Sequence, residues 1–366
     1  MSNFDPVSDA GDGGVAALRR CLSPQLAALG ITRVADLTDL DHIGIPVFGA
    51  IRPWSRSFAV TQGKGLDADA AWLGAVMEAL ELRAAEAPLT LAAKPERTDL
   101  AVWLPPSVTA FDGPWLQARC WATGAPWRVP AGVVQLDLTR PSGLRGWRRT
   151  STGLGAHTRR TEAVRHALLE VVERHALGLA RTNPRDVHLI DGGRPRCGRL
   201  GALLDRLAGL GLPPRLYRLA TVAGLVTVKA RLASAAPSGA PVFGSAADVD
   251  LERAALRAVL ECIQSRVTRL AGARDDLTQR DYAADEEAAL LVGLAAQRGH
   301  AAWPTDAPTA TRDLAEADAI VARLAEAGLG PVLVVDLASG SPDVRVVKVL
   351  AVGLADSFAA PRMLAA

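Results

Sequence analysis

The sequence predicts an α+β protein made of internally duplicated helix and strand units, with a binding site between long helices and sheet. Two observations lead to this fold class. Three long segments with helical periodicity alternate with short strand-like runs. In addition, the order helix, strand, strand occurs twice in the second half of the chain. It is predicted at 203–210, 215–219 and 225–232, and again at 317–327, 332–337 and 344–352.

The two units also have similar sequences. Arg206-Leu-Ala-Gly-Leu-Gly-Leu-Pro213 resembles Arg323-Leu-Ala-Glu-Ala-Gly-Leu-Gly-Pro331. Repetition of a whole α/β unit indicates internal duplication, with chance similarity as the alternative.

Length and composition describe an ordinary globular protein. The 366 residues exceed the size at which a single core stops growing, so two lobes are expected. The net charge of +2 argues against a nucleic-acid or anionic-membrane binder. The four cysteines form no C-x-x-C pair, which excludes a zinc knuckle. With no long apolar run and no signal peptide, we expect no membrane span and a cytoplasmic location.

The expected domain organisation is a short N-terminal segment followed by one main domain. Residues 1–40 form a helical segment, in which the helix Ala16–Leu29 ends at Gly30. The main domain spans 41–366, and its two lobes are expected at 41–185 and 186–366.

The main domain begins with two strand-like runs and a glycine-rich loop, and a long helix follows. Pro184 ends the second long helix, because proline cannot continue the hydrogen-bond ladder. The expected elements, in order, are the strands Ile45–Ile51 and Phe58–Thr61, the loop Gln62–Gly65, the helix Asp67–Glu86, the strand Val133–Leu138, the helix Glu162–Thr182 and the helix Leu251–Leu270.

Each long helix carries two polar residues three positions apart, framed by aliphatic residues. At this spacing both side chains of a pair leave the same side of the helix. The pairs are Glu78/Glu81, Glu170/Glu173 and Glu261/Gln264. If the three polar edges converge, five carboxylates line one cavity, and a hard divalent cation such as Mg²⁺ would relieve their repulsion. The alternative is three half-exposed helices with local salt bridges.

Basic residues near these helices suit a polyphosphate, since guanidinium groups match phosphate oxygens. The candidates are Lys64, Arg174, Arg257, Arg266 and Arg274. No G-x-x-x-x-G-K-[ST] motif occurs, and no G-x-G-x-x-G follows a strand. A nucleotide site would therefore have to be an unusual one, built from helix carboxylates.

Several motifs resemble the YcaO family, and the resemblance covers roughly residues 30–355. They are Gly44–Ser57 (Gly-Ile-Pro-Val-Phe-Gly-Ala-Ile-Arg-Pro-Trp-Ser-Arg-Ser), Gln62–Gly65, Met77–Glu81, Glu162-Ala163 with His166–Arg174, and Gln264–Arg266 with Gly272–Asp276. The segments Asp41–Val47, Arg52–Ser57 and Gln62–Gly65 are most similar to the branch associated with TfuA proteins.

The resemblance implies a YcaO-like catalytic domain that uses ATP and Mg²⁺ to activate a backbone amide of a ribosomally made peptide. With external sulfide the product is a thioamide, and the TfuA-associated branch is linked to this product. With a Cys, Ser or Thr side chain as nucleophile it is an azoline, which makes a cyclodehydratase the alternative. The C-terminus has a single proline after residue 360, which favours the thioamide. Expected partners are the peptide substrate, a TfuA-like protein and, as an open alternative, a second copy of the chain in a homodimer.

The resemblance also implies roles for individual residues. Mg²⁺ ligands would be Glu78, Glu81, Glu170, Glu173 and Glu261. ATP-binding residues would be Lys64, Thr158, Glu162, Arg174, Arg257, Gln264 and Arg274. Gly74, Thr158 and Arg257 depart from the family pattern, which has Ser, Asn and, in some members, Gln there. These departures leave a non-catalytic peptide-binding scaffold as a third reading. No general base is evident, and His166 is interpreted as structural.

Overall fold

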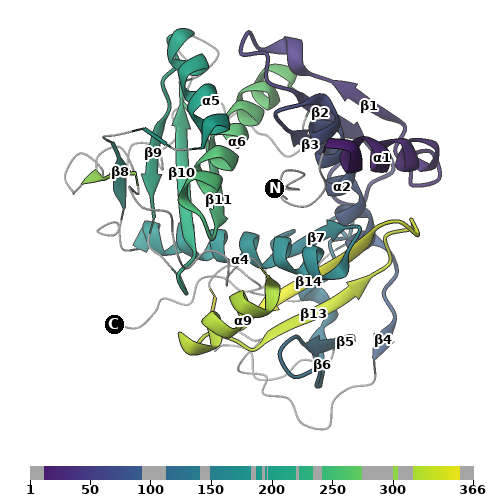
Figure 1. The fold of residues 1–366 in the computed structure, drawn as a ribbon. Helices are drawn as coiled ribbons and strands as arrows, with labels where there is room; N and C mark the ends of the chain where they lie inside the picture. The colour runs from purple at the N-terminus through teal and green to yellow at the C-terminus, as the bar shows by residue number, and fades with distance from the viewer. Residues whose placement is uncertain are drawn as a thin grey trace.

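The computed structural model describes residues 12–92, 113–140, 149–182, 187–191, 194–195, 197–219, 222–233, 241–273, 300–303 and 316–354. Within them the fold is α+β, with three sheets and three long helices (Figure 1). None of the helices in these ranges combines the length and the apolar character needed to cross a membrane.

The first sheet is antiparallel and has the order β1-β2-β3. Its strands are β1 (Arg33–Asp36), β2 (Val47–Ile51) and β3 (Val60–Lys64), and β3 leads into α2 (Ala68–Glu86). Asp67 caps α2 by accepting a hydrogen bond from the backbone N–H of Ala70 at 2.8 Å. The preceding helix α1 (Asp12–Leu22) packs against α2.

The second sheet has the order β11-β10-β9-β8-β12. Its strands are β8 (His188–Ile190), β9 (Arg215–Arg218), β10 (Val226–Leu232), β11 (Val242–Asp248) and β12 (His300–Ala301). The edge strand β11 leads into α6 (Leu251–Ala271), which Gly272 ends in the left-handed conformation at φ 57°. The helix α5 (Gly198–Gly209) contacts α6.

The third sheet joins the middle and the end of the chain, in the order β4-β5-β13-β14-β7 with β6 paired to β5. Its strands are β4 (Leu91–Ala92), β5 (Trp115–Cys120), β6 (Pro126–Pro130), β7 (Leu154–His157), β13 (Val332–Leu337) and β14 (Arg345–Ala351). The edge strand β7 leads into α4 (Arg160–Thr182), and α9 (Ala317–Glu326) packs against α4.

The third sheet is buried on both faces. Alternate residues of β13 and β14 belong to two different cores, because successive strand residues point to opposite faces. Leu333, Val346 and Leu350 pack on the side of α2, whereas Val334 and Val349 pack on the side of α4. The predicted lobe boundary near residue 185 stays a prediction, and these pairings tie the last strands to the first half of the chain.

The three sheets share one arrangement, in which an edge strand runs directly into a long helix that packs against its own sheet. We call each sheet with its long helix a unit, numbered in the order of the sheets. The strand and helix pairs are β3 with α2, β11 with α6, and β7 with α4. The two predicted helix, strand, strand units are confirmed as α5-β9-β10 and α9-β13-β14, and in each the two strands pair antiparallel.

Three local predictions were wrong. The helix expected over Ala16–Leu29 is α1, which ends at Leu22, and a 3₁₀ turn containing Pro24 follows because proline cannot donate to the helical ladder. The expected loop Gln62–Gly65 is mostly strand β3. Val133–Leu138 pairs with no strand within the described residues; Val133 ends a 3₁₀ turn (Ala131–Val133), and Leu136 donates its N–H to the carbonyl of Ala85.

Candidate functional site

The three polar pairs of the long helices are buried. The six side chains Glu78, Glu81, Glu170, Glu173, Glu261 and Gln264 belong to residues that are between 1% and 9% exposed. Buried carboxylates are costly unless they are paired or bind a cation. The alternative of half-exposed helices with solvated polar faces is therefore wrong.

A glycine in each edge strand lets the helix approach closely enough to place its polar pair beside the strand. A Cβ on Gly63 would lie 2.1 Å from the backbone nitrogen of Ala75. On Gly155 or Gly244 it would lie 2.3 Å from the carbonyl oxygen of Ala163 or Ala258. At all three positions the missing side chain allows close packing of helix on strand.

The first glutamate of each pair is held near a strand end. Glu78 accepts a hydrogen bond from the backbone N–H of Gln62 at 3.2 Å. Glu170 accepts one from the backbone N–H of Gly153 at 2.9 Å. Glu261 forms an ion pair of 3.5 Å with Lys64, which lies at the end of β3. Lys64 therefore joins the first sheet to Glu261 on α6, the helix that packs against the second sheet.

The second member of each pair reaches toward a different unit. Gln264 on α6 donates to the carbonyl of Gln62 on β3 at 3.2 Å. Glu173 on α4 accepts from the Ser245 hydroxyl on β11 at 2.7 Å. Glu81 on α2 acts electrostatically on Lys348, which lies on β14 of the third sheet. These two hydrogen bonds and one electrostatic interaction connect the three units in a cycle. We call the three polar pairs, together with Gln62, Ser245 and Lys348, the polar ring.

Electrostatic coupling also indicates that carboxylates of the polar ring lie close to one another. Burial raises the pKa of Glu173 to about 7; Glu261 and Glu170 add to the rise, while Arg174 opposes it. Burial lowers the pKa of His166 well below its ordinary value, with further lowering by Arg257. His166 is therefore neutral near pH 7, in keeping with its interpretation as structural.

Of the candidate phosphate-binding arginines, Arg174 borders the polar ring, whereas Arg257 and Arg266 pair with buried aspartates. Arg174 is half-buried and lies 3.7 Å from Glu170 and 3.9 Å from Glu173, so it borders the polar ring. Arg257 binds the buried Asp248 at 3.3 Å. Arg266, a candidate by sequence, is fully buried and binds Asp41 at 2.7 Å. Arg274 lies outside the described residues.

Thr158 and Glu162 lie at the start of α4, away from its polar pair. Glu162 is 3.6 Å from Arg159 and 3.9 Å from Arg165. Thr158 is exposed, and its hydroxyl lies 3.4 Å from Nδ1 of His157. Since a helix rises about 1.5 Å per residue, Glu162 is roughly 12 Å along the axis from Glu170. Thr158 and Glu162 would therefore contact a long ligand at a different point from Glu170 and Glu173.

The polar ring fits a cation that is shared with an oxygen-rich ligand. Buried Gln264 Oε1 and Gln62 Nε2 have no hydrogen-bond partner in the described part of the chain, so both can still bind a ligand. Among the residues described, no three His, Cys, Asp or Glu side chains are grouped tightly enough to hold a metal alone. Mg²⁺ commonly completes such a site with phosphate oxygens and water.

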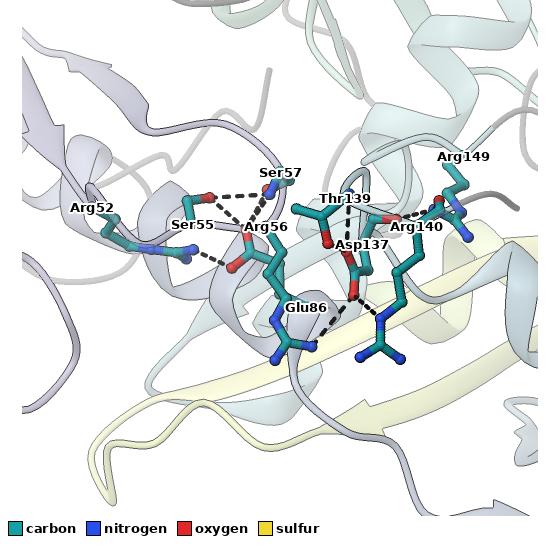
Figure 2. A network of polar contacts seen from close by, with 9 residues as sticks. All are labelled: Arg52, Ser55, Arg56, Ser57, Glu86, Asp137, Thr139, Arg140 and Arg149. Carbon is teal, nitrogen blue, oxygen red and sulfur yellow. Dashed lines mark hydrogen bonds and ion pairs between the residues drawn. The ribbon is translucent and has the colours of Figure 1, made fainter.

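A second polar network fixes the motif Arg52–Ser57 at the end of α2 (Figure 2). Buried Glu86 accepts hydrogen bonds from the side chains of Arg52 and Ser55 and from the backbone N–H of Ser57. Buried Asp137 pairs with Arg56 at 3.3 Å and with Arg140 at 3.8 Å. The network anchors the helix that carries Glu78 and Glu81, which gives this motif a structural role.

Sequence reasoning missed three residues of the polar ring: Gln62, Ser245 and Lys348. Gln62 and Ser245 are ordinary polar residues on strands and give no signal of their own. Lys348 had a signal, because the chain holds only four lysines and 37 arginines, and this lysine lies within an apolar strand.

The raised pKa of Glu173 predicts how the stability of the metal-free protein depends on pH. A carboxyl group whose pKa is higher in the folded state contributes its stability below its ordinary pKa of 4.5 and loses it as pH rises to about 7. Glu173→Gln should remove this loss, making the variant more stable than the wild type by up to roughly 3 kcal/mol above pH 7. Urea unfolding in EDTA from pH 4 to 8 measures the difference; parallel curves would contradict the prediction.

These observations fit a class of enzymes that bind a nucleotide and a divalent cation. The chain belongs to the YcaO family: the family model described as YcaO cyclodehydratase, ATP- and Mg²⁺-binding, matches residues 62–355. ATP and Mg²⁺ are therefore the cofactors of its family.

Known relatives agree with this assignment. A protein from the tfuA 3′ region of Rhizobium leguminosarum bv. trifolii is 32% identical over 95% of this chain and 90% of its own length. The structure of YcaO from Methanopyrus kandleri, bound with AMPPCP and Mg²⁺, has 25% identity and a TM-score of 0.72, covering 93% of this chain and 91% of that one. A heterocyclase in complex with substrate and cofactor shares the fold, with 18% identity and a TM-score of 0.73, covering 96% of this chain and 55% of that one.

Proposed function

We propose that this YcaO protein converts a backbone amide of a ribosomally made peptide into a thioamide, using ATP and a TfuA-like partner. The buried polar ring carries the proposal, because buried carboxylates from three helices beside Arg174 and Lys64 suit a Mg²⁺–polyphosphate complex. The relative from the tfuA 3′ region supports the partner and the sulfur chemistry. The peptide substrate and the catalytic domain at 41–366, with its two lobes, belong to the same proposal.

In this reaction ATP supplies a phosphoryl group for the amide oxygen. Sulfide adds to the amide carbon, and the oxygen leaves with the phosphate, so the products are the thioamide, ADP and phosphate. The protein contributes positioning and charge neutralisation. Proposed metal ligands are Glu78, Glu81, Glu170, Glu173 and Glu261; residues proposed to face ATP are Lys64, Thr158, Glu162, Arg174, Arg257 and Gln264, together with Arg274 outside the described residues.

Azoline formation is the second candidate, because the heterocyclase with bound substrate has the same fold. The packing of α2 weakens the argument from Gly74 for a non-catalytic scaffold. A Cβ on Gly74 would lie 3.1 Å from Cα of Gly63, so a small residue at this position serves the packing of α2 on β3. Absence of the family's serine is therefore compatible with an assembled site.

Mass spectrometry of the product separates the three functions. The purified chain, the TfuA-like protein from the same genome and peptides encoded by neighbouring genes are incubated with ATP, Mg²⁺ and a sulfide source. We expect ATP hydrolysis that depends on the peptide, and a gain in mass equal to the exchange of oxygen for sulfur. Loss of one water would establish azoline formation instead, and binding of peptide without ATP turnover would establish a scaffold.

A further inference from the structure

Lys348 is a buried charge without a place in the proposed chemistry. The chain uses arginine for nearly all its positive charge, yet two of its four lysines, Lys229 and Lys348, lie buried within the described residues. Lys348 is 0% exposed. Burial of an ammonium group is strongly unfavourable unless opposite charges and hydrogen bonds compensate it.

The strand register directs Lys348 toward α2. Its neighbours at alternate positions of β14, Val346 and Leu350, are buried in the core that contains the apolar side chains of α2. Because strand side chains alternate between faces, Lys348 lies on this same side. It is paired with Leu154 on the edge strand β7, and its ammonium group donates to the carbonyl of Thr150 at 2.7 Å.

Two carboxylates from two different helices partly offset the cost of burying Lys348. Burial lowers the pKa of Lys348 to about 8, while Glu170 on α4 and Glu81 on α2 oppose this lowering. Glu170 is held close to this strand, because it accepts the backbone N–H of Gly153 just before β7. Strand β14 packs against both helices, so one ammonium group acts electrostatically on carboxylates of both, which would otherwise repel each other.

We propose that Lys348 is a positioning residue, whose ammonium group is a counter-ion that holds Glu81 and Glu170 in place while no metal is bound. The proposal rests on the proposed function, in which both glutamates bind Mg²⁺. With Lys348 present, α2 and α4 keep their polar pairs assembled before the nucleotide arrives. Without it, the assembled site depends on the metal for its neutralisation.

The test is the thermal stability of Lys348→Met, which keeps the shape of the side chain and removes its charge. In EDTA the variant should lose on the order of 5–10 °C in Tm, as expected for unpaired buried carboxylates in a chain of this size. Saturating Mg²⁺ with a non-hydrolysable ATP analogue should restore most of the loss. The rise in Tm on adding both should therefore be larger in the variant than in the wild type.

Arg52→Met is the matched control. Arg52 is a buried cation that binds the buried Glu86 in the second polar network, outside the polar ring. Its loss of Tm should be equal with and without Mg²⁺ and nucleotide. The same equal loss in Lys348→Met would overturn the proposal, because it would show a packing role. If Lys348→Met fails to fold, adding Glu81→Gln should restore folding by removing one repelling carboxylate, and failure to do so would also overturn it.

The wild type separates this inference from the proposed function. If Mg²⁺ and the nucleotide analogue do not raise its Tm, the assignment of the metal ligands is wrong, and this proposal falls with it. If they stabilise the wild type and Lys348→Met responds like Arg52→Met, the metal site stands and only the role of Lys348 is rejected.

Discussion

Replacing Glu170 and Glu173 together by glutamine should abolish the binding of Mg²⁺ and ATP and leave the fold intact. Both side chains are buried, and in the proposed site both bind the cation. Loss of one supporting residue around a metal costs about 10–100-fold in affinity, so loss of two ligands should cost more than about 100-fold. Calorimetric titration of the wild type and the variant with ATP, in the presence of Mg²⁺, measures this loss.

The fold should survive because glutamine keeps the acceptor oxygens that the structure uses. These oxygens accept the backbone N–H of Gly153 and the hydroxyl of Ser245. Glu326→Gln, on the exposed side of α9, is a control for the removal of a negative charge elsewhere. An unchanged ATP affinity in a folded double variant would show that the metal ligands lie elsewhere.

Gly244→Ala should unfold the protein or destabilise it by at least about 3 kcal/mol, the cost typical of severe overpacking. The added Cβ would lie 2.3 Å from the carbonyl oxygen of Ala258 and 2.5 Å from the backbone nitrogen of Cys262. Neither backbone atom can move without separating α6 from β11. Such a separation would also displace Glu261 from Lys64, so nucleotide affinity should fall together with stability.

Gly201→Ala provides the matched substitution. Gly201 lies inside α5, and a Cβ there would meet nothing within 4 Å. Because alanine favours a helix over glycine, this variant should be more stable by about 0.5–1 kcal/mol. Chemical denaturation of both variants tests the pair; a Gly244→Ala protein as stable as Gly201→Ala would contradict the close packing of α6 on β11.

The polar pairs and the long helices were predictable because their signal is local. Glu170 and Glu173 stand three residues apart in an aliphatic helix, and this spacing alone places them on one side. The partners were not predictable in the same way. Gln264 binds the backbone carbonyl of Gln62, which lies 202 residues away in the sequence. Because every residue has a backbone carbonyl, the residue type at position 62 does not reveal this contact.

Two misreadings have physical causes. Glycine serves both sharp turns and close packing, so Gly63 was read as part of a loop although it lies within a strand. Arg266 was read as a phosphate-binding residue because it follows Gln264 on the third helix. Its partner Asp41 is 225 residues distant, and a buried ion pair of this kind cannot be told from a ligand-binding arginine by sequence.

The cyclic cross-linking of the three units has a consequence for the order in which the protein folds. Each link joins segments that are far apart in the sequence, and the link through Lys348 needs the last described strand of the chain. Contacts of such long range form late, because the chain must first lose the entropy of closing large loops. During synthesis, α2 and α4 leave the ribosome long before β14, so their carboxylates stay unassembled until β14 has also been made. Chains truncated before β14 should therefore be unable to bind the nucleotide.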